Sequence, residues 1–165
     1  MTMHRDTNVP PEAFLSYLLH FHGTRDYFEC HEILEDHWKS EDIKNPLWSG
    51  LIQLAVSQYH HRRGNFRGAV RLLEKAIVKL PADDPQLQEL GVDGPQLHTL
   101  LNTLQTRAAN QQLYKSVILP LSPSLQKACQ VACDEQGLLF GQQSDLTNDS
   151  LINRHIERHL SDKRL

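Results

Sequence analysis

Histidine and glutamate side chains gather in residues 27–39, which read YFECHEILEDHWK. His31 and Glu35 are four residues apart, so in a helix, which turns about 100° per residue, they share one face. A histidine and a carboxylate at this spacing can hold one divalent metal ion from a single helix. A carboxylate beside Phe28 and Trp38 loses hydration, which raises its pKa and suits it to proton transfer. The spacing therefore predicts either a metal site or an acid/base site.

A second group of polar side chains follows at helical spacing in residues 46–63. Gln53, Ser57 and His60 fall on one stripe, and the opposite side of the same helix is apolar. If this stripe faces the histidine and glutamate of the first stretch, a pocket results between the two helices. The predicted site consists of catalytic Glu35 and His31, ligand-binding Glu32, Trp38, Gln53 and His60, and metal ligands His31, Glu35 and His60.

The same side chains also have a plain structural explanation. His31 and Glu35 can form an ordinary pair one helical turn apart, which stabilises a helix by about 0.2–0.5 kcal/mol. Gln53 and His60 can be core polar groups that hydrogen-bond to backbone or buried water. The stretch contains neither a zinc-binding His-Glu-x-x-His run nor a di-iron Glu-x-x-His run. Spacing alone leaves both explanations open.

Helical periodicity dominates the chain, and strand patterns are weak. The connections are short, so we expect an all-α protein, a compact antiparallel bundle of about six or seven helices. Residues 46–80 resemble one tetratricopeptide repeat, and no second copy follows, which indicates a single helical hairpin. The predicted helices cover residues 10–21, 27–39, 46–63, 66–80, 96–114, 124–136 and 150–160. We expect one domain over residues 1–165, with a helical core at 10–80, a connector rich in proline and glycine at 81–95, and a helical C-terminal extension at 96–165.

Composition excludes several classes of protein. The 165 residues carry a net charge of −3 with a pI of about 6.3, which disfavours nucleic-acid binding. Three cysteines without a framework spacing argue against a disulfide-stabilised secreted domain. No apolar run approaches the roughly 18 residues that span a bilayer, and the N-terminus lacks the apolar segment of a signal peptide. We therefore expect a cytoplasmic protein that does not enter membranes.

Two segments carry a family resemblance. FHGTRDYFECHEILEDHWK and LIQLAVSQYHHRRGNFRGAVRLLEKA resemble the signature of domain-of-unknown-function family number 309, a bacterial and archaeal family of small helical proteins without an established activity. The resemblance covers about residues 14–80 and implies a helical fold. It also implies that His31, Glu35, Gln53 and His60 form one site, but it supplies no substrate. The matching positions are Phe28, Glu29, His31, Glu32, Glu35, Trp38, Gln53, His60, Gly64 and Asn65.

Two classes of function fit these observations. The first is a polar His/Glu pocket that binds a divalent metal ion or a small ligand, with a metal-dependent hydrolase as its enzymatic form. The alternative is a protein–protein interaction module or a homo-oligomer in which the same polar residues are structural. In that case a basic patch would contact an acidic protein partner. The patch consists of Arg62, Arg63, Arg67 and Arg71.

Overall fold

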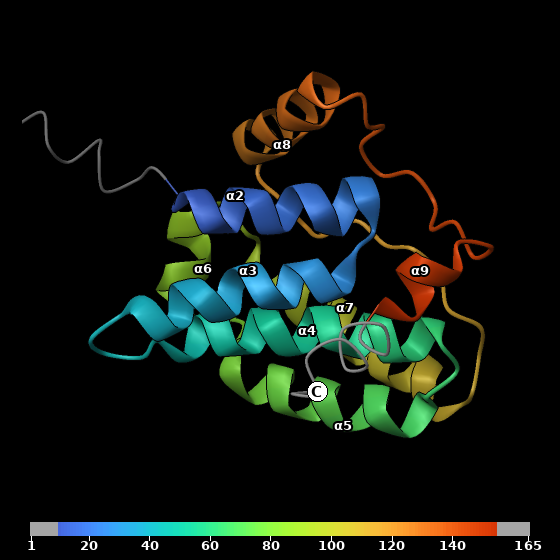
Figure 1. Ribbon diagram of the computed structural model, residues 1–165. Helices are drawn as coiled ribbons and strands as arrows, with labels where there is room; N and C mark the ends of the chain where they lie inside the picture. Colours follow the sequence, from blue (N-terminus) through green and yellow to red (C-terminus); the bar gives the residue numbers. More distant parts are fainter. Residues whose placement is uncertain (1–9, 155–165) are drawn as a thin grey trace, which may run out of the picture.

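The computed structural model describes residues 10–154, and this part of the chain is built from helices (Figure 1). Its one β feature is an isolated antiparallel bridge between Val92 and Leu121. The all-α prediction is confirmed. The helical elements are α2 (Glu12–Leu19), η1 (His20–Thr24), α3 (Tyr27–Ser40), α4 (Pro46–Arg62), α5 (Phe66–Lys79), α6 (Pro85–Leu90), α7 (Gly94–Ala109), α8 (Pro123–Glu135) and α9 (Asp149–Ile152).

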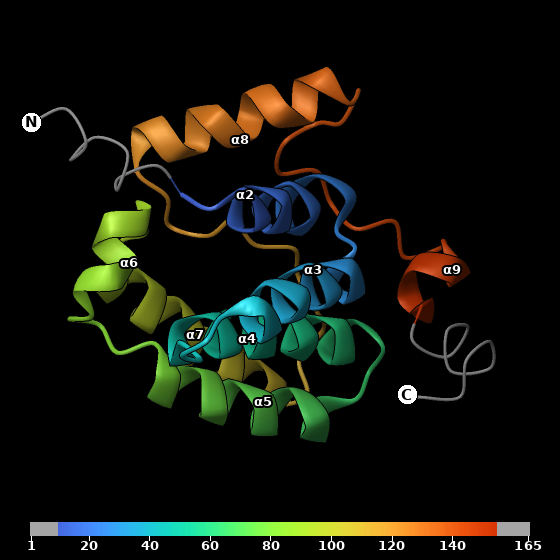
Figure 2. The ribbon, with the colours of Figure 1, turned by 60° about the vertical axis from the view of Figure 1, so that its left-hand side comes forward.

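The helices α2, α3, α4 and α5 lie side by side, with α7 behind them and α8 above α2 (Figures 1 and 2). The first helix was predicted to cover residues 10–21, but the helical conformation continues to Thr24 because the last turn widens into the π-helical η1. Arg25 then takes the left-handed conformation, with φ 60°, and reverses the chain. Asp26 caps α3 by accepting a hydrogen bond from the backbone N–H of Glu29 at 3.1 Å.

The hairpin of α4 and α5 follows the sequence prediction closely. Asn45 caps α4, Pro46 occupies its first turn, and Asn65 caps α5. Gly64 turns the corner at φ +82°, a conformation that glycine adopts without steric cost. At the other end of the hairpin, Gly50 lets the chain after α5 approach closely, since a Cβ atom there would lie 2.8 Å from Leu80 Cγ.

Residues 81–95 are not the plain connector that the prolines suggested. They contain the short helix α6, which starts at Pro85 behind the capping residue Asp84. Proline suits the first turn of a helix because its missing N–H has no partner to lose there. Pro95 serves α7 in the same way, and α7 ends at Ala109 rather than at residue 114.

The segments before and after α8 both return to the first helices. The backbone N–H of Leu119 donates to His22 Nε2 at 3.0 Å, and that of Gly141 donates to the His22 carbonyl at 2.9 Å. Most of the predicted helix at 150–160 lies outside the described residues, where α9 covers Asp149–Ile152. Among the described residues, no helix combines the length and apolarity needed to cross a bilayer. The predicted division into core, connector and extension stays a prediction.

Candidate functional site

Helices α3 and α4 run antiparallel, and two ring contacts fix their register. Phe28 meets Tyr59 with ring centroids 5.8 Å apart, and His37 meets Trp48 at 5.1 Å. Each helix rises about 1.5 Å per residue, so the positions between these two contacts can be matched across the helices. Gln53 on α4 then lies level with the middle of α3. On α3 this level falls between His31 and Glu35, and Gln53 lies on the neighbouring helix.

His31 and Glu35 form a contact on α3, with 3.6 Å between His31 Nε2 and Glu35 Oε2. The side chains are 18% and 39% exposed, and the His31 ring packs against Phe28 with centroids 5.3 Å apart. Burial lowers the pKa of His31, and the neighbouring Glu35 carboxylate opposes that shift. His31 is therefore a mainly neutral imidazole at pH 7 beside a carboxylate that also contacts Lys39 at 3.6 Å.

Two buried polar atoms of this region lack a hydrogen-bond partner among the described residues. They are Nδ1 of His31 and Oε1 of Gln53. The Glu35 carboxylate can only accept, so it favours the His31 tautomer with the proton on Nε2. His31 Nδ1 then carries a free lone pair, as Gln53 Oε1 does. The site thus presents two unmet acceptors, and both need a donor or a cation.

The other predicted site residues lie around this pair in different ways. His60 Nδ1 is 3.1 Å from the Asn65 amide nitrogen, and burial lowers the His60 pKa, helped by the charge of Arg63. By the α3–α4 register, His60 lies about 7 Å further along the helices than His31. Trp38 is partly buried and lies under the Lys44 ammonium, 5.7 Å from the ring centroid. Glu32 is half-buried and already interacts within the fold.

The sequence predicted a metal site with three ligands, His31, Glu35 and His60. Within residues 10–154, no group of three or more histidine, cysteine, aspartate or glutamate side chains is placed to hold a metal ion. Glutamine is not among these residue types, so the finding does not describe Gln53. The structure pairs His31 with Glu35 on α3 and places Gln53 at the same level on α4, and it places His60 toward the C-terminal end of α4.

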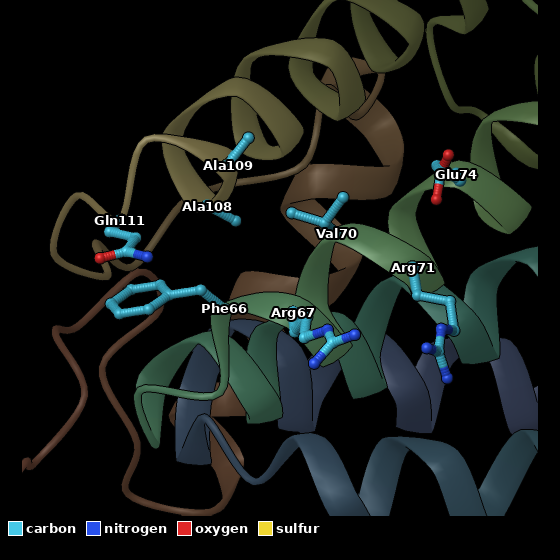
Figure 3. A pocket seen from close by; sticks show the side chains of 8 residues that line it. All are labelled: Phe66, Arg67, Val70, Arg71, Glu74, Ala108, Ala109 and Gln111. Carbon is cyan, nitrogen blue, oxygen red and sulfur yellow. The ribbon is translucent and has the colours of Figure 1, made fainter.

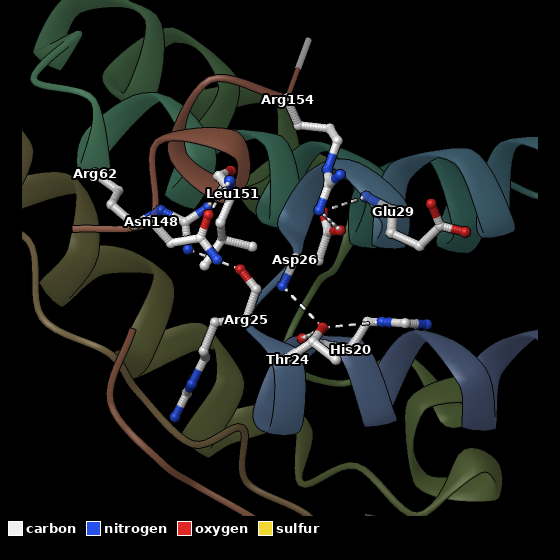
Figure 4. A network of polar contacts seen from close by, with 9 residues as sticks. All are labelled: His20, Thr24, Arg25, Asp26, Glu29, Arg62, Asn148, Leu151 and Arg154. Atoms are coloured by element: carbon white, nitrogen blue, oxygen red, sulfur yellow. Dashed lines mark hydrogen bonds and ion pairs between the residues drawn. The ribbon is translucent and has the colours of Figure 1, made fainter. Parts of the chain in front are cut away.

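The predicted basic patch needs a correction at Arg62, which is only 9% exposed. Its guanidinium donates to the Arg25 carbonyl at 2.7 Å and lies over the Tyr27 ring, 4.6 Å from the centroid (Figure 4). It also donates to Ser144 Oγ at 3.2 Å. A helix-surface pattern could not show this, because the partners come from distant parts of the chain. Arg63 donates to Asn153 Oδ1 at 3.0 Å.

Three other buried polar residues were missed by the sequence analysis. His22 is fully buried, and its Nδ1 lies 2.9 Å from the Leu18 carbonyl. Arg25, 1% exposed, donates to the carbonyls of Phe21, Val117 and Gln142. His61 is 2% exposed, with Nε2 2.8 Å from the Gln112 carbonyl. No spacing pattern marks these residues, because most of their partners are more than fifty positions away.

The comparisons with known proteins place the site within a family. The family model described as domain of unknown function DUF309 matches residues 14–72. The uncharacterized protein YpuF of Bacillus subtilis (strain 168) is 43% identical over 155 residues, which cover 92% of this chain and 89% of YpuF. The chain belongs to the DUF309 family. The resemblance in the sequence is thereby confirmed, and all predicted site residues lie inside the matched DUF309 segment.

The match to YpuF also bears on the C-terminal half of this DUF309 protein. Because it covers 92% of the chain, it extends well beyond the segment that the family model matches. The helices after residue 80 are therefore shared with YpuF and are not peculiar to this chain. No solved structure matches the chain.

Proposed function

We propose that the α3–α4 face binds a small cationic ligand, either a divalent metal ion or a protonated amine. The observation that carries this proposal is the pair of unmet buried acceptors, His31 Nδ1 and Gln53 Oε1. Leaving a buried polar group without a partner costs about 1–3 kcal/mol, so a bound group that meets both atoms gains that much. The Glu35 carboxylate, which contacts His31, adds negative charge to this face.

The charges and lone pairs of the site favour a cationic ligand over an anionic one. An anion would meet two acceptors and a carboxylate, which repel it, and the nearby Lys39 ammonium is already paired with Glu35. A divalent metal ion would take the imidazole nitrogen, the amide oxygen and the carboxylate as ligands. It would supply the Lewis acidity that a hydrolase needs, with Glu35 near enough to receive a proton. A protonated amine would instead donate hydrogen bonds to the same three groups.

The same helix offers a matched control for testing this function. His37 and Glu41 form a second pair four residues apart, also with 3.6 Å between nitrogen and oxygen. Neither His37 nitrogen is a buried atom without a partner in the described part of the chain. His37→Phe therefore removes an equivalent histidine but keeps an aromatic ring against Trp48, so that the α3–α4 register and the proposed site stay intact.

The experiment combines elemental analysis of the purified protein with calorimetric titration of zinc, manganese and putrescine. The wild-type protein and His37→Phe are expected to bind one of these probes at one equivalent per chain. His31→Gln and Gln53→Met are expected to weaken binding at least about tenfold while the circular dichroism spectrum stays unchanged. If all three probes fail on the wild type, or if His37→Phe weakens binding as much as His31→Gln, the proposal is wrong.

The alternative class, an interaction module, rests on a different surface. The exposed arginines of the predicted basic patch lie on α5, away from the α3–α4 register described above.

A further inference from the structure

A groove of about 340 Å³ lies between the first turns of α5 and the end of α7 (Figure 3). Phe66, Val70 and Ala108 supply its apolar lining. Arg67 and Arg71 extend from α5 beside this lining. The groove thus combines an apolar floor with a charged rim, and its volume suits one or two side chains of a partner.

The floor of the groove is held in place before anything binds. The Phe66 ring packs edge-on against the ring of His61, with centroids 5.7 Å apart. His61 is itself fixed by its contact with the Gln112 carbonyl at 2.8 Å. Asn65 caps α5 directly before Phe66, accepting from the Gly68 N–H at 3.0 Å. A preformed site loses little conformational entropy on binding.

The rim carries two cations, Arg67 and Arg71. In residues 10–154, neither Arg67 nor Arg71 takes part in an ion pair. They are four positions apart on one helix, so their side chains leave the same face about one turn from each other. Glu74 follows three positions later and also lines the groove. The charge order along the rim is therefore positive, positive, negative.

We propose that this groove binds an acidic segment of a partner protein. An apolar side chain of the segment would lie on Phe66 and Val70, and two carboxylates one turn apart would pair with Arg67 and Arg71. A nucleic acid fits less well, because Glu74 would repel its phosphates and the whole chain carries a net charge of −3. A phosphate backbone would also make no favourable contact with the apolar floor.

A randomised peptide library displayed on phage is the probe that tests this. Selection on the full-length wild-type protein is followed by synthesis of the enriched peptides and fluorescence anisotropy. The expected peptides carry aspartate or glutamate at two positions beside a large apolar residue. The double variant Arg67→Glu/Arg71→Glu is expected to bind them at least about tenfold more weakly. The control Lys115→Glu/Lys127→Glu makes the same change in net charge on neither α5 nor α7 and is expected to bind like the wild type.

Four outcomes would overturn the proposal. The first is enrichment of peptides without acidic residues, or no enrichment at all. The second is equal weakening in the groove variant and in the Lys115→Glu/Lys127→Glu control, which would show only a general charge effect. The third is competition for Arg67 and Arg71 by a single-stranded RNA that binds more tightly than any selected peptide, which would assign the groove to phosphate. A dimer that dissociates only in the groove variant, without peptide binding, would assign it to a second copy of the chain.

Discussion

Lowering the pH from about 8 to about 5 is expected to destabilise this protein through His22, a residue outside both proposed binding sites. The ring is fully buried, with Nδ1 2.9 Å from the Leu18 carbonyl and Nε2 accepting from the Leu119 N–H at 3.0 Å. Both nitrogens are satisfied only in the neutral tautomer that carries its proton on Nδ1. A second proton on Nε2 would face the N–H of Leu119.

The size of the effect follows from the pKa of His22 in the two states. Burial, helped by the charge of Arg25 and opposed by the hydrogen bond to Leu18, lowers this pKa from 6.5 to about 4. The unfolded chain therefore binds a proton between pH 6.5 and pH 4 that the folded chain does not bind. The stabilising contribution is fully present above pH 6.5 and is lost as the pH falls through this window. From these two values, the free energy of unfolding decreases by about 2 kcal/mol between pH 8 and pH 5.

Urea unfolding at a series of pH values, followed by circular dichroism, measures the change. His22→Gln keeps a donor and an acceptor but cannot titrate, so its pH dependence should be smaller by about 2 kcal/mol over the same range. Burial lowers the pKa values of His20, His31 and His60 as well, and the difference between wild type and variant removes their contributions.

An NMR titration of the His22 ring nitrogens in the wild type checks the cause directly and does not depend on how well the variant folds. A His22 pKa at or above 6.5, the ordinary value, would refute the reasoning. A wild type and variant with parallel stability curves would refute it too.

Two further predictions test the packing. Gly94→Ala is expected to lower the free energy of unfolding by about 2 kcal/mol or more, because its Cβ would lie 2.2 Å from the Ala82 carbonyl oxygen and backbone must move. Gly64→Ala, where the space is open and only φ +82° is unfavourable, should cost about 1 kcal/mol in the same urea assay. A fragment of residues 10–80 is expected not to fold alone, which circular dichroism and amide NMR dispersion would show. A dispersed, cooperative fragment would contradict this.

The elements that the sequence predicted well are those decided by neighbouring residues. Asp26 and Asn65 cap the helices that follow them, and Pro46 begins α4, all from contacts within one turn. The helix α6 was missed because proline was interpreted only as a breaker. Pro85 occupies the first turn, where proline favours a helix, so the information was local and was misinterpreted.

The candidate site depends partly on contacts that sequence spacing cannot predict. Spacing on one helix was enough to pair His31 with Glu35, because both belong to α3. The level of Gln53 depends on how α3 and α4 slide past each other, and the aromatic contacts at the two ends of this interface set that register. Sequence periodicity gives the face of each helix but not the offset between two helices.

The same reasoning explains why two arginines that look like surface residues are buried. A buried guanidinium has five donors and needs acceptors, and in this fold most of the acceptors belong to the C-terminal half of the chain. Arg25 takes those of Val117 and Gln142, and Arg62 reaches that of Leu151 at 3.4 Å. Without these segments both guanidinium groups would lose hydrogen-bond acceptors inside the protein. A buried charge without a partner costs more free energy than a buried neutral polar group without one.

The C-terminal half therefore completes the helices that carry the family signature. A relative that keeps the first helices must also keep the segments that satisfy their buried arginines. The match to YpuF, which covers 92% of this chain, agrees with this requirement. The ion pair of Arg154 with Asp26, 2.9 Å long, closes the same connection at the N-terminus of α3 (Figure 4). The helix that carries His31 and Glu35 is thus fixed at its start by residues that follow it by more than a hundred positions.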